Sequence, residues 1–161
     1  MREQQADQGK VDGGKRMKVE SIVLGSIGTN CYIVTNEETK ECFAVDMADC
    51  PQEFVKHIKD AGLCVKALLL THGHFDHIGA IDELVEKYNC PIYIHQDDYE
   101  MIYNDQLNLS NYYGELKIKS KATAVDKDID VGDFHFEFLH LPGHTIGSCF
   151  ILSLIHISEP T

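Results

Sequence analysis

Four side chains that can bind a metal ion lie close together in the segment Thr71-His72-Gly73-His74-Phe75-Asp76-His77. Three are imidazoles and one is a carboxylate, which is a ligand set that Zn²⁺ and similar divalent ions prefer. A further histidine follows downstream in Pro142-Gly143-His144-Thr145. Packing gives no reason to crowd histidines in this way. The sequence therefore predicts a metal site whose candidate ligands are His72, His74, Asp76, His77 and His144.

The neighbouring elements explain how these ligands can converge. The apolar run at residues 65–70 is typical of a buried strand, and a loop that leaves such a strand is well placed to hold ligands. His72 and His74 are two residues apart, so in an extended segment they point the same way. Apolar residues at 78–88 follow helical spacing. A strand, a loop and a helix with four ligands at the joint predict a site for two neighbouring ions, rather than a solvated histidine-rich loop.

Two motifs resemble those of a known family. The pattern His-x-His-x-Asp-His at residues 72–77 resembles the signature of the metallo-β-lactamase-fold hydrolases, and PGHTIGS at 142–148 resembles their second signature, PGHTxGS. TNCYIV at 29–34 and AVD at 44–46 resemble the first strands of the glyoxalase II-like (hydroxyacylglutathione hydrolase-like) subgroup. The resemblance covers residues 17–151. It implies an α/β (α+β) fold, the four-layer αββα sandwich, of which this chain would contain the N-terminal half and only the start of the second half.

The resemblance also implies a role for each ligand. His72, His74 and His144 would hold the first metal ion, and Asp76 and His77 would be the protein's share of the second. Two Zn²⁺ ions are expected in the full-length protein, with Fe or Mn as alternatives. Family members add a bridging aspartate and a terminal histidine downstream of the PGHT motif, so we expect the second site to be incomplete in this chain.

A hydrolytic reaction follows from these ligands. Zn²⁺ held by three histidines keeps a position open for water and lowers the pKa of that water to about 7. The resulting hydroxide would attack a carbonyl, and Asp76 would be catalytic by orienting it and relaying a proton to the leaving group. The resemblance narrows the substrate to a small-molecule ester or thioester, with a hydroxyacylglutathione-type thioester as the first choice. No substrate-binding residue is identified.

Other functions remain open at this stage. Related proteins use similar ligands to hold a single iron ion and oxidise persulfides, so an oxidoreductase of that kind is one alternative. An inactive metal-binding fragment is another. Lactonase, β-lactamase and nuclease activities occur within the same fold, because fold does not fix function.

The chain is expected to divide into three parts. Residues 1–16 are polar and are predicted to be a disordered leader or to follow a misassigned start, with Met17 as the alternative start. Residues 17–151 form the C-terminally truncated metallo-β-lactamase-like domain. Residues 152–161, LSLIHISEPT, resemble the translation of a sequencing adapter and are predicted to be a non-native tail, with a genuine short strand as the alternative.

Composition restricts the partners. A formal net charge of −12 argues against nucleic acid and anionic membranes as partners. No apolar run reaches the length needed to span a bilayer, and no export signal precedes the domain, so a cytoplasmic location is expected.

The six cysteines show no paired spacing, and Cys31, Cys64 and Cys149 are interpreted as small core residues. The oligomeric state is not predicted.

The other elements and polar residues can be placed coarsely. Strands are predicted at 18–24, 31–35, 42–46, 92–95 and 134–138, a helix at 51–61, and one or two short helices within 97–114. His95 and His140 are expected on the surface or behind the ligands rather than on the metal. Asp46 is interpreted either as support for a ligand histidine or as a turn residue at a strand end.

Overall fold

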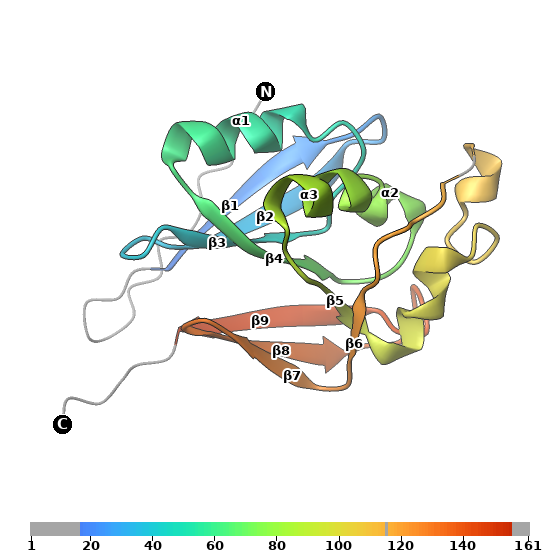
Figure 1. Cartoon of the computed structure of the whole chain (residues 1–161). Coiled ribbons are helices and arrows are strands. Elements are labelled where there is room, and N and C mark those ends of the chain that lie inside the picture. Colours follow the sequence, from blue (N-terminus) through green and yellow to red (C-terminus); the bar gives the residue numbers. More distant parts are fainter. Residues whose placement is uncertain (1–16, 115, 156–161) are drawn as a thin grey trace.

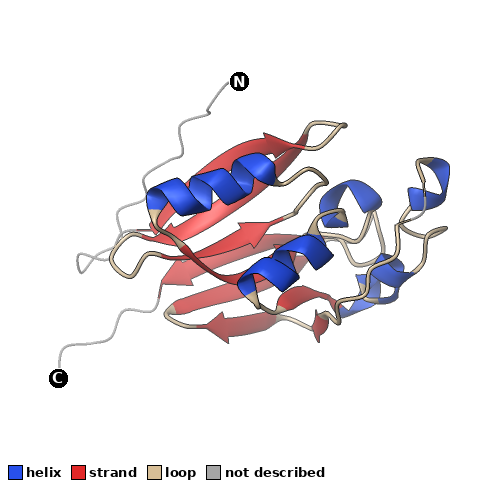
Figure 2. Ribbon diagram, turned by 45° about the horizontal axis from the view of Figure 1, so that its top comes forward, coloured by secondary structure: helices blue, strands red, loops and turns tan. Residues whose placement is uncertain are grey.

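Two β-sheets lie face to face, and α-helices cover the outer face of the larger sheet (Figures 1 and 2). The structure is a computed structural model that describes residues 17–114 and 116–155. The six-stranded sheet contains β1 (Met17–Leu24), β2 (Thr29–Asn36), β3 (Glu41–Val45), β4 (Cys64–Leu70), β5 (Ile92–His95) and β6 (Thr123–Val125) in that order. The three-stranded sheet contains β7 (Asp128–Val131), β8 (Phe134–His140) and β9 (Cys149–Ile155).

The direction of the strands decides where the ligands gather. Strands β1 to β3 form an antiparallel meander, whereas β3, β4, β5 and β6 run parallel to one another. The carboxyl ends of parallel neighbours meet at one edge of a sheet, and open α/β sheets bind ligands there. The histidine-rich segment leaves β4 at this edge, so Asp46 after β3 and residues 96–98 after β5 lie beside it.

The helices bury one face each against the larger sheet. Helix α1 (Gln52–Ala61) buries Phe54 and Ile58, and it ends at Gly62, whose φ of 64° is the left-handed conformation that glycine adopts at little cost. Helix α3 (Ile81–Tyr88) buries Ile81 and Leu84. Together with the inner residues of the sheet, these side chains form the first of two hydrophobic cores.

The second core lies between the two sheets. Phe43 of β3 contacts Phe134 and Phe136 of β8 edge to face, with ring centroids 4.7 and 4.8 Å apart. The phenylalanines of β8 alternate with His135 and Glu137, which are partly exposed, and this confirms the alternation expected from the sequence. Through this core β8 packs against the larger sheet. The chain continues directly from β8 into the segment that bears His144.

The structure corrects the predicted helix at residues 78–88. The chain instead forms a short helix α2 (Phe75–Ile78), breaks at Gly79 and Ala80, and begins α3 at Ile81. The break follows from two backbone hydrogen bonds with the turn after β3, from Met47 N to the His77 carbonyl (2.9 Å) and from Ala80 N to the Met47 carbonyl (3.2 Å). Asp76 and His77 therefore lie on a helical turn and not in a loop.

Three other expectations differ from the structure. Residues 97–114 contain parts of three 3₁₀ helices, η1 (Gln96–Asp98), η2 (Glu100–Tyr103) and η3 (Ser110–Tyr112), rather than one or two helices. Strands β6 and β7 were not expected. Cys64 is exposed, because it begins β4 and its side chain points to the opposite side from buried Val65.

The fold class is confirmed as a mixed α/β sandwich. Within the described residues, helices cover the larger sheet only, so these residues contain three of the four expected layers (Figure 1). Residues 152–155 continue β9 and pair with β8. The assignment of 152–161 to a non-native tail stays a prediction, and the predicted leader at 1–16 lies outside the described residues, as do 156–161.

Candidate metal centre

The structure brings all five predicted ligands to one place. His72, His74, Asp76 and His77 come from the segment that follows β4, and His144 comes from the loop between β8 and β9. Potential ligand atoms of His72, His74 and His144 lie within 4.8 Å of one another, and those of His72, Asp76 and His77 do the same. Nδ1 of His74 is 3.0 Å from Nε2 of His144, although 69 residues separate them along the chain. The two groups share His72.

A chain of hydrogen bonds orients His72. The Thr71 hydroxyl donates to Oδ2 of Asp46 (2.6 Å), because an ionised carboxylate only accepts. The same hydroxyl oxygen lies 3.0 Å from Nδ1 of His72, so it must accept the Nδ1–H of the imidazole. Nε2 of His72 is then the nitrogen with a free lone pair. Among the described residues this buried atom has no hydrogen-bond partner, which is what a metal ligand atom requires in the absence of its ion.

Asp46 also supports His77. Nδ1 of His77 lies 3.1 Å from Oδ2 of Asp46, close enough for an ion pair although the N–H does not point straight at the carboxylate. The carboxylate favours a proton on Nδ1, which leaves Nε2 as the ligand atom, 3.4 Å from Oδ2 of Asp76. Asp46 thus fulfils both roles proposed for it, since its φ of 60° also makes it a turn residue at the end of β3.

The surroundings set the protonation of these imidazoles differently. Burial, assisted by the neighbouring His77, lowers the pKa of His72 to about 4. Burial and His144 also lower the pKa of His74. Burial opposes the charged form of His77 as well, but the Asp46 and Asp76 carboxylates outweigh it and raise the pKa of His77. Neutral imidazole is the form that binds metal, so His72 is ready to bind at neutral pH.

These residues fit a divalent metal ion. The donor set is nitrogen from imidazoles plus one carboxylate oxygen, and the unpartnered Nε2 of His72 lies where the other donors converge. The three histidines form one group of possible ligands, and Asp76 and His77 form a second group together with His72. The assignment of individual ligands remains a prediction.

A third group of possible ligands, His95, Asp97 and His140, is engaged in other contacts. Nδ1 of His95 accepts the backbone N–H of Asp97 (3.1 Å), and Nε2 of His140 lies 2.7 Å from the Ile146 carbonyl oxygen. The two imidazoles stack with centroids 4.1 Å apart and planes 18° apart, so their in-plane lone pairs do not converge on one point. Through its contact with the Ile146 carbonyl, His140 stabilises the loop that bears His144.

Two polar residues of the site were not identified from the sequence as parts of it. Thr71 precedes the histidines directly and links Asp46 to His72. Asp98 is fully buried and accepts hydrogen bonds from both ligand-bearing segments. The signal that could have indicated Asp98 is its place just after β5, since the ends of parallel strands β3, β4 and β5 meet at one edge.

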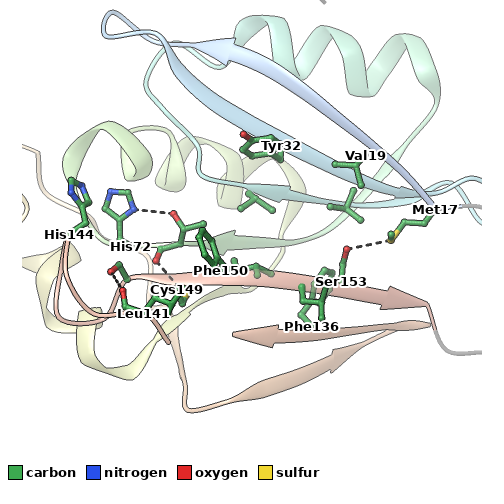
Figure 3. A pocket seen from close by; sticks show the side chains of 16 residues that line it. Met17, Val19, Tyr32, His72, Phe136, Leu141, His144, Cys149, Phe150 and Ser153 are labelled. Carbon is green, nitrogen blue, oxygen red and sulfur yellow. Dashed lines mark hydrogen bonds between the residues drawn. The ribbon is translucent and has the colours of Figure 1, made fainter. Parts of the chain in front are cut away.

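A cavity of about 740 Å³ lies next to the histidines (Figure 3). Val19 and Tyr32 line it from the larger sheet, and Phe136 and Cys149 line it from the smaller sheet. His72 and His144 lie at one end. Its walls are mostly apolar.

The fold and this cluster define a class, the α/β sandwich proteins with a histidine-rich divalent-metal site between two sheets. The family model of the metallo-beta-lactamase superfamily matches residues 25–156, and the chain belongs to that family. It is similar to the probable metallo-hydrolase YqgX of Bacillus subtilis, with 35% identity over 82% of this chain and 64% of the relative. It is also similar to the hydroxyacylglutathione hydrolase GloC of Haemophilus influenzae, with 27% identity over 81% of this chain and 64% of GloC.

Solved structures agree with the fold. The BLEG-1 B3 metallo-beta-lactamase superposes with a TM-score of 0.75 at 30% identity, covering 85% of this chain and 66% of that protein. TTHA1623, solved in a di-iron-bound form, gives a TM-score of 0.67 at 30% identity, covering 80% of this chain and 63% of that protein. The chain spans about 64% of the length of the first curated relatives that it matches. In the part of the chain that the structure describes, no helix is long and apolar enough to cross a membrane.

Proposed function

We propose that this protein is a zinc-dependent hydrolase that cleaves an ester or thioester, with a hydroxyacylglutathione-type thioester as the first candidate substrate. The observation that supports this most strongly is the convergence of Nε2 of His72, Nδ1 of His74 and Nε2 of His144, which come from two different sheets. Such a three-histidine site leaves a position for water or substrate.

Each residue has a distinct role in this proposal. His72, His74 and His144 hold the first ion, and Asp76 and His77 contribute to the second. When bound, a divalent ion lowers the pKa of water and polarises a carbonyl. Asp76, half-buried next to His77, accepts a proton from the attacking water and returns it to the sulfur or oxygen of the leaving group. The products of thioester cleavage are then a carboxylic acid and a thiol.

Two observations support a small-molecule thioester. The similarity to GloC and to the hydroxyacylglutathione hydrolase of Bdellovibrio bacteriovorus, at 27% and 28% identity, favours this substrate class. The apolar cavity that ends at His72 and His144 offers space for the substrate beside the reacting bond.

The net charge of −12 disfavours nucleic acid as the substrate. We place this activity in the cytoplasm, without a membrane partner.

Iron is the second candidate metal. TTHA1623, 30% identical to this chain, was solved in a di-iron-bound form, and imidazole and carboxylate ligands suit iron as well as zinc. A protein that retains one iron ion and no zinc would favour the alternative of an oxidoreductase that acts on persulfides. Metal analysis of the purified chain separates the two possibilities before any activity is measured.

The proposal is tested by hydrolysis of S-D-lactoylglutathione by the zinc-loaded chain. We expect turnover, and we expect His72→Ala to lower kcat/KM by more than about 100-fold, since even the outer partners of metal ligands contribute about 10–100-fold. His57→Ala is the matched control, because His57 lies on α1 and contacts Glu20 instead. Hydrolysis of a β-lactam but not of the thioester would correct the substrate, and a zinc-loaded chain that hydrolyses neither would contradict the proposal.

A further inference from the structure

Asp98 joins the two segments that carry the candidate ligands. It ends the 3₁₀ helix after β5, and its side chain is fully buried. Oδ2 accepts the backbone N–H of Gly73 (3.0 Å) and the hydroxyl of Thr145 (2.6 Å), and Oδ1 accepts the backbone N–H of Gly147 (2.8 Å). One carboxylate thus receives three donors, which satisfies a buried charge.

The donors lie beside the ligands themselves. Gly73 stands between His72 and His74, and Thr145 directly follows His144. One segment leaves the six-stranded sheet after β4, whereas the other connects β8 and β9 of the smaller sheet. The 3.0 Å approach of His74 to His144 is therefore a contact between two sheets, and on each side of it Asp98 accepts a hydrogen bond from the residue next to a candidate ligand.

The fit at Asp98 is close. A Cβ atom added to Gly147 would lie 2.5 Å from the Asp98 backbone nitrogen and 2.7 Å from its Oδ1 atom. At their base the same two segments are joined independently, by a hydrogen bond from Cys149 N to the Thr71 carbonyl (3.0 Å). Loss of the Asp98 carboxylate therefore leaves the segments connected but releases the portions that carry His74 and His144.

We propose that Asp98 is a positioning residue that sets the spacing of His74 and His144 and thereby the affinity of the three-histidine site for a divalent cation. The inference rests on the metal site of the proposed function, but it does not depend on which substrate is cleaved. The three hydrogen bonds of Asp98 come from backbone N–H and hydroxyl groups next to the predicted ligands, and Asp98 acts on the ligand spacing through these groups.

The test is the Zn²⁺ dissociation constant of the full chain, measured by competition with a chromophoric chelator. Asp98→Asn keeps the shape of the side chain, but in either orientation its amide group faces a donor. We expect this variant to bind Zn²⁺ about 10–100-fold more weakly. We also expect a changed visible spectrum of the Co²⁺-loaded chain, which reports ligand geometry independently of activity.

The matched control is Asp82→Asn. Asp82 likewise accepts two backbone N–H groups, from Lys119 (2.9 Å) and Ser120 (2.8 Å), but it holds a different segment. We expect this variant to keep the parent's Zn²⁺ affinity and Co²⁺ spectrum within about twofold. Equal weakening by Asp98→Asn and Asp82→Asn would show a general loss of stability and would overturn the proposal.

A second pair of variants keeps the proposal testable if Asp98→Asn does not fold. Thr145→Val removes one of the three donors with little change of shape and should weaken Zn²⁺ binding, whereas Thr145→Ser retains the hydroxyl and should restore it. A folded Asp98→Asn or Thr145→Val variant with the parent's affinity and Co²⁺ spectrum would contradict this inference alone. A parent chain that binds no Zn²⁺ would contradict the proposed function together with it.

Discussion

Thr71 shows how one hydroxyl can decide the ligand form of a histidine. Its proton goes to Asp46, so its oxygen accepts the Nδ1–H of His72 and leaves Nε2 free. The sequence pattern predicted the ligands because their residue types and spacing are specific. It did not predict Thr71 or Asp98, because threonine and aspartate are common and their role appears only once distant strands are adjacent.

Thr71→Val tests the orientation of His72. Valine has a similar shape but cannot link Asp46 to the imidazole, so we expect Zn²⁺ affinity to fall by about 10-fold or more. Thr35→Val is the control, because the Thr35 hydroxyl is also buried but has no hydrogen-bond partner in the described part of the chain. Chelator competition measures both variants. Equal Zn²⁺ affinity of the two would contradict the role of Thr71.

The pH dependence of metal binding follows from the histidine environments. Burial lowers the pKa of His72 to about 4, whereas the neighbouring carboxylates raise the pKa of His77 above its usual value. Protons must leave a histidine before metal binds, so acid competes first at His77. As pH falls from about 8 to about 5, we expect the ion held by Asp76 and His77 to be lost before the ion of the three-histidine site.

Metal content per chain, measured after equilibration at each pH, checks this order. A two-step loss in which His77→Ala removes only the step at higher pH supports the assignment. Simultaneous loss of both ions, or earlier loss from the three-histidine site, would show that the different pKa values of the two sites do not govern binding.

At the scale of elements, strong apolar patterns were predictable and short contacts were not. Strands β1 to β5 and β8 and helix α1 have clear periodicity and were predicted close to their observed positions. Strands β6 and β7 are short and mostly exposed or half-exposed, so they lack the buried apolar residues that mark the equally short β5. The break between α2 and α3 depends on hydrogen bonds to Met47, which lies about 30 residues earlier, and local spacing cannot reveal it.

The loop between β8 and β9 offers a test of its close approach to Asp98. Gly147→Ala places a methyl group against the Asp98 backbone, and we expect destabilisation of about 1–3 kcal/mol. Gly143→Ala is the control in the same loop, because a Cβ atom there meets nothing within 4 Å. Thermal unfolding of the metal-free chains compares them. Equal Tm values for the two variants would mean that the loop does not pack as described.

At the scale of the whole molecule, the two sheets supply different parts of one site. The larger sheet carries four of the predicted ligands and the smaller sheet brings His144, held by the phenylalanine core between them. The family's fold and the ligand cluster were predictable because the two motifs contain the candidate ligands and occur in the order that is typical of the family. Less predictable were the apolar side chains that strands β8 and β9 expose, Leu139, Phe150, Leu152 and Leu154.

These exposed apolar side chains predict association of the chain. Leu139 pairs with Phe150 across β8 and β9, and exposed apolar patches on sheets promote self-association. We expect sedimentation to show assemblies that grow with concentration, and Leu139→Lys with Leu154→Lys to reduce them. Ile27→Lys, at an exposed turn between β1 and β2 and outside the smaller sheet, is the control. A chain that stays monomeric, or a control that reduces association equally, would contradict this prediction.

The most direct test of the account is a crystal structure of the zinc-soaked chain with anomalous diffraction recorded at the zinc edge. We predict a strong anomalous peak bounded by His72, His74 and His144, within about 2.0–2.1 Å of one nitrogen of each. A peak at His95, Asp97 and His140 instead, or no peak at the three histidines, would contradict the assignment of the metal centre.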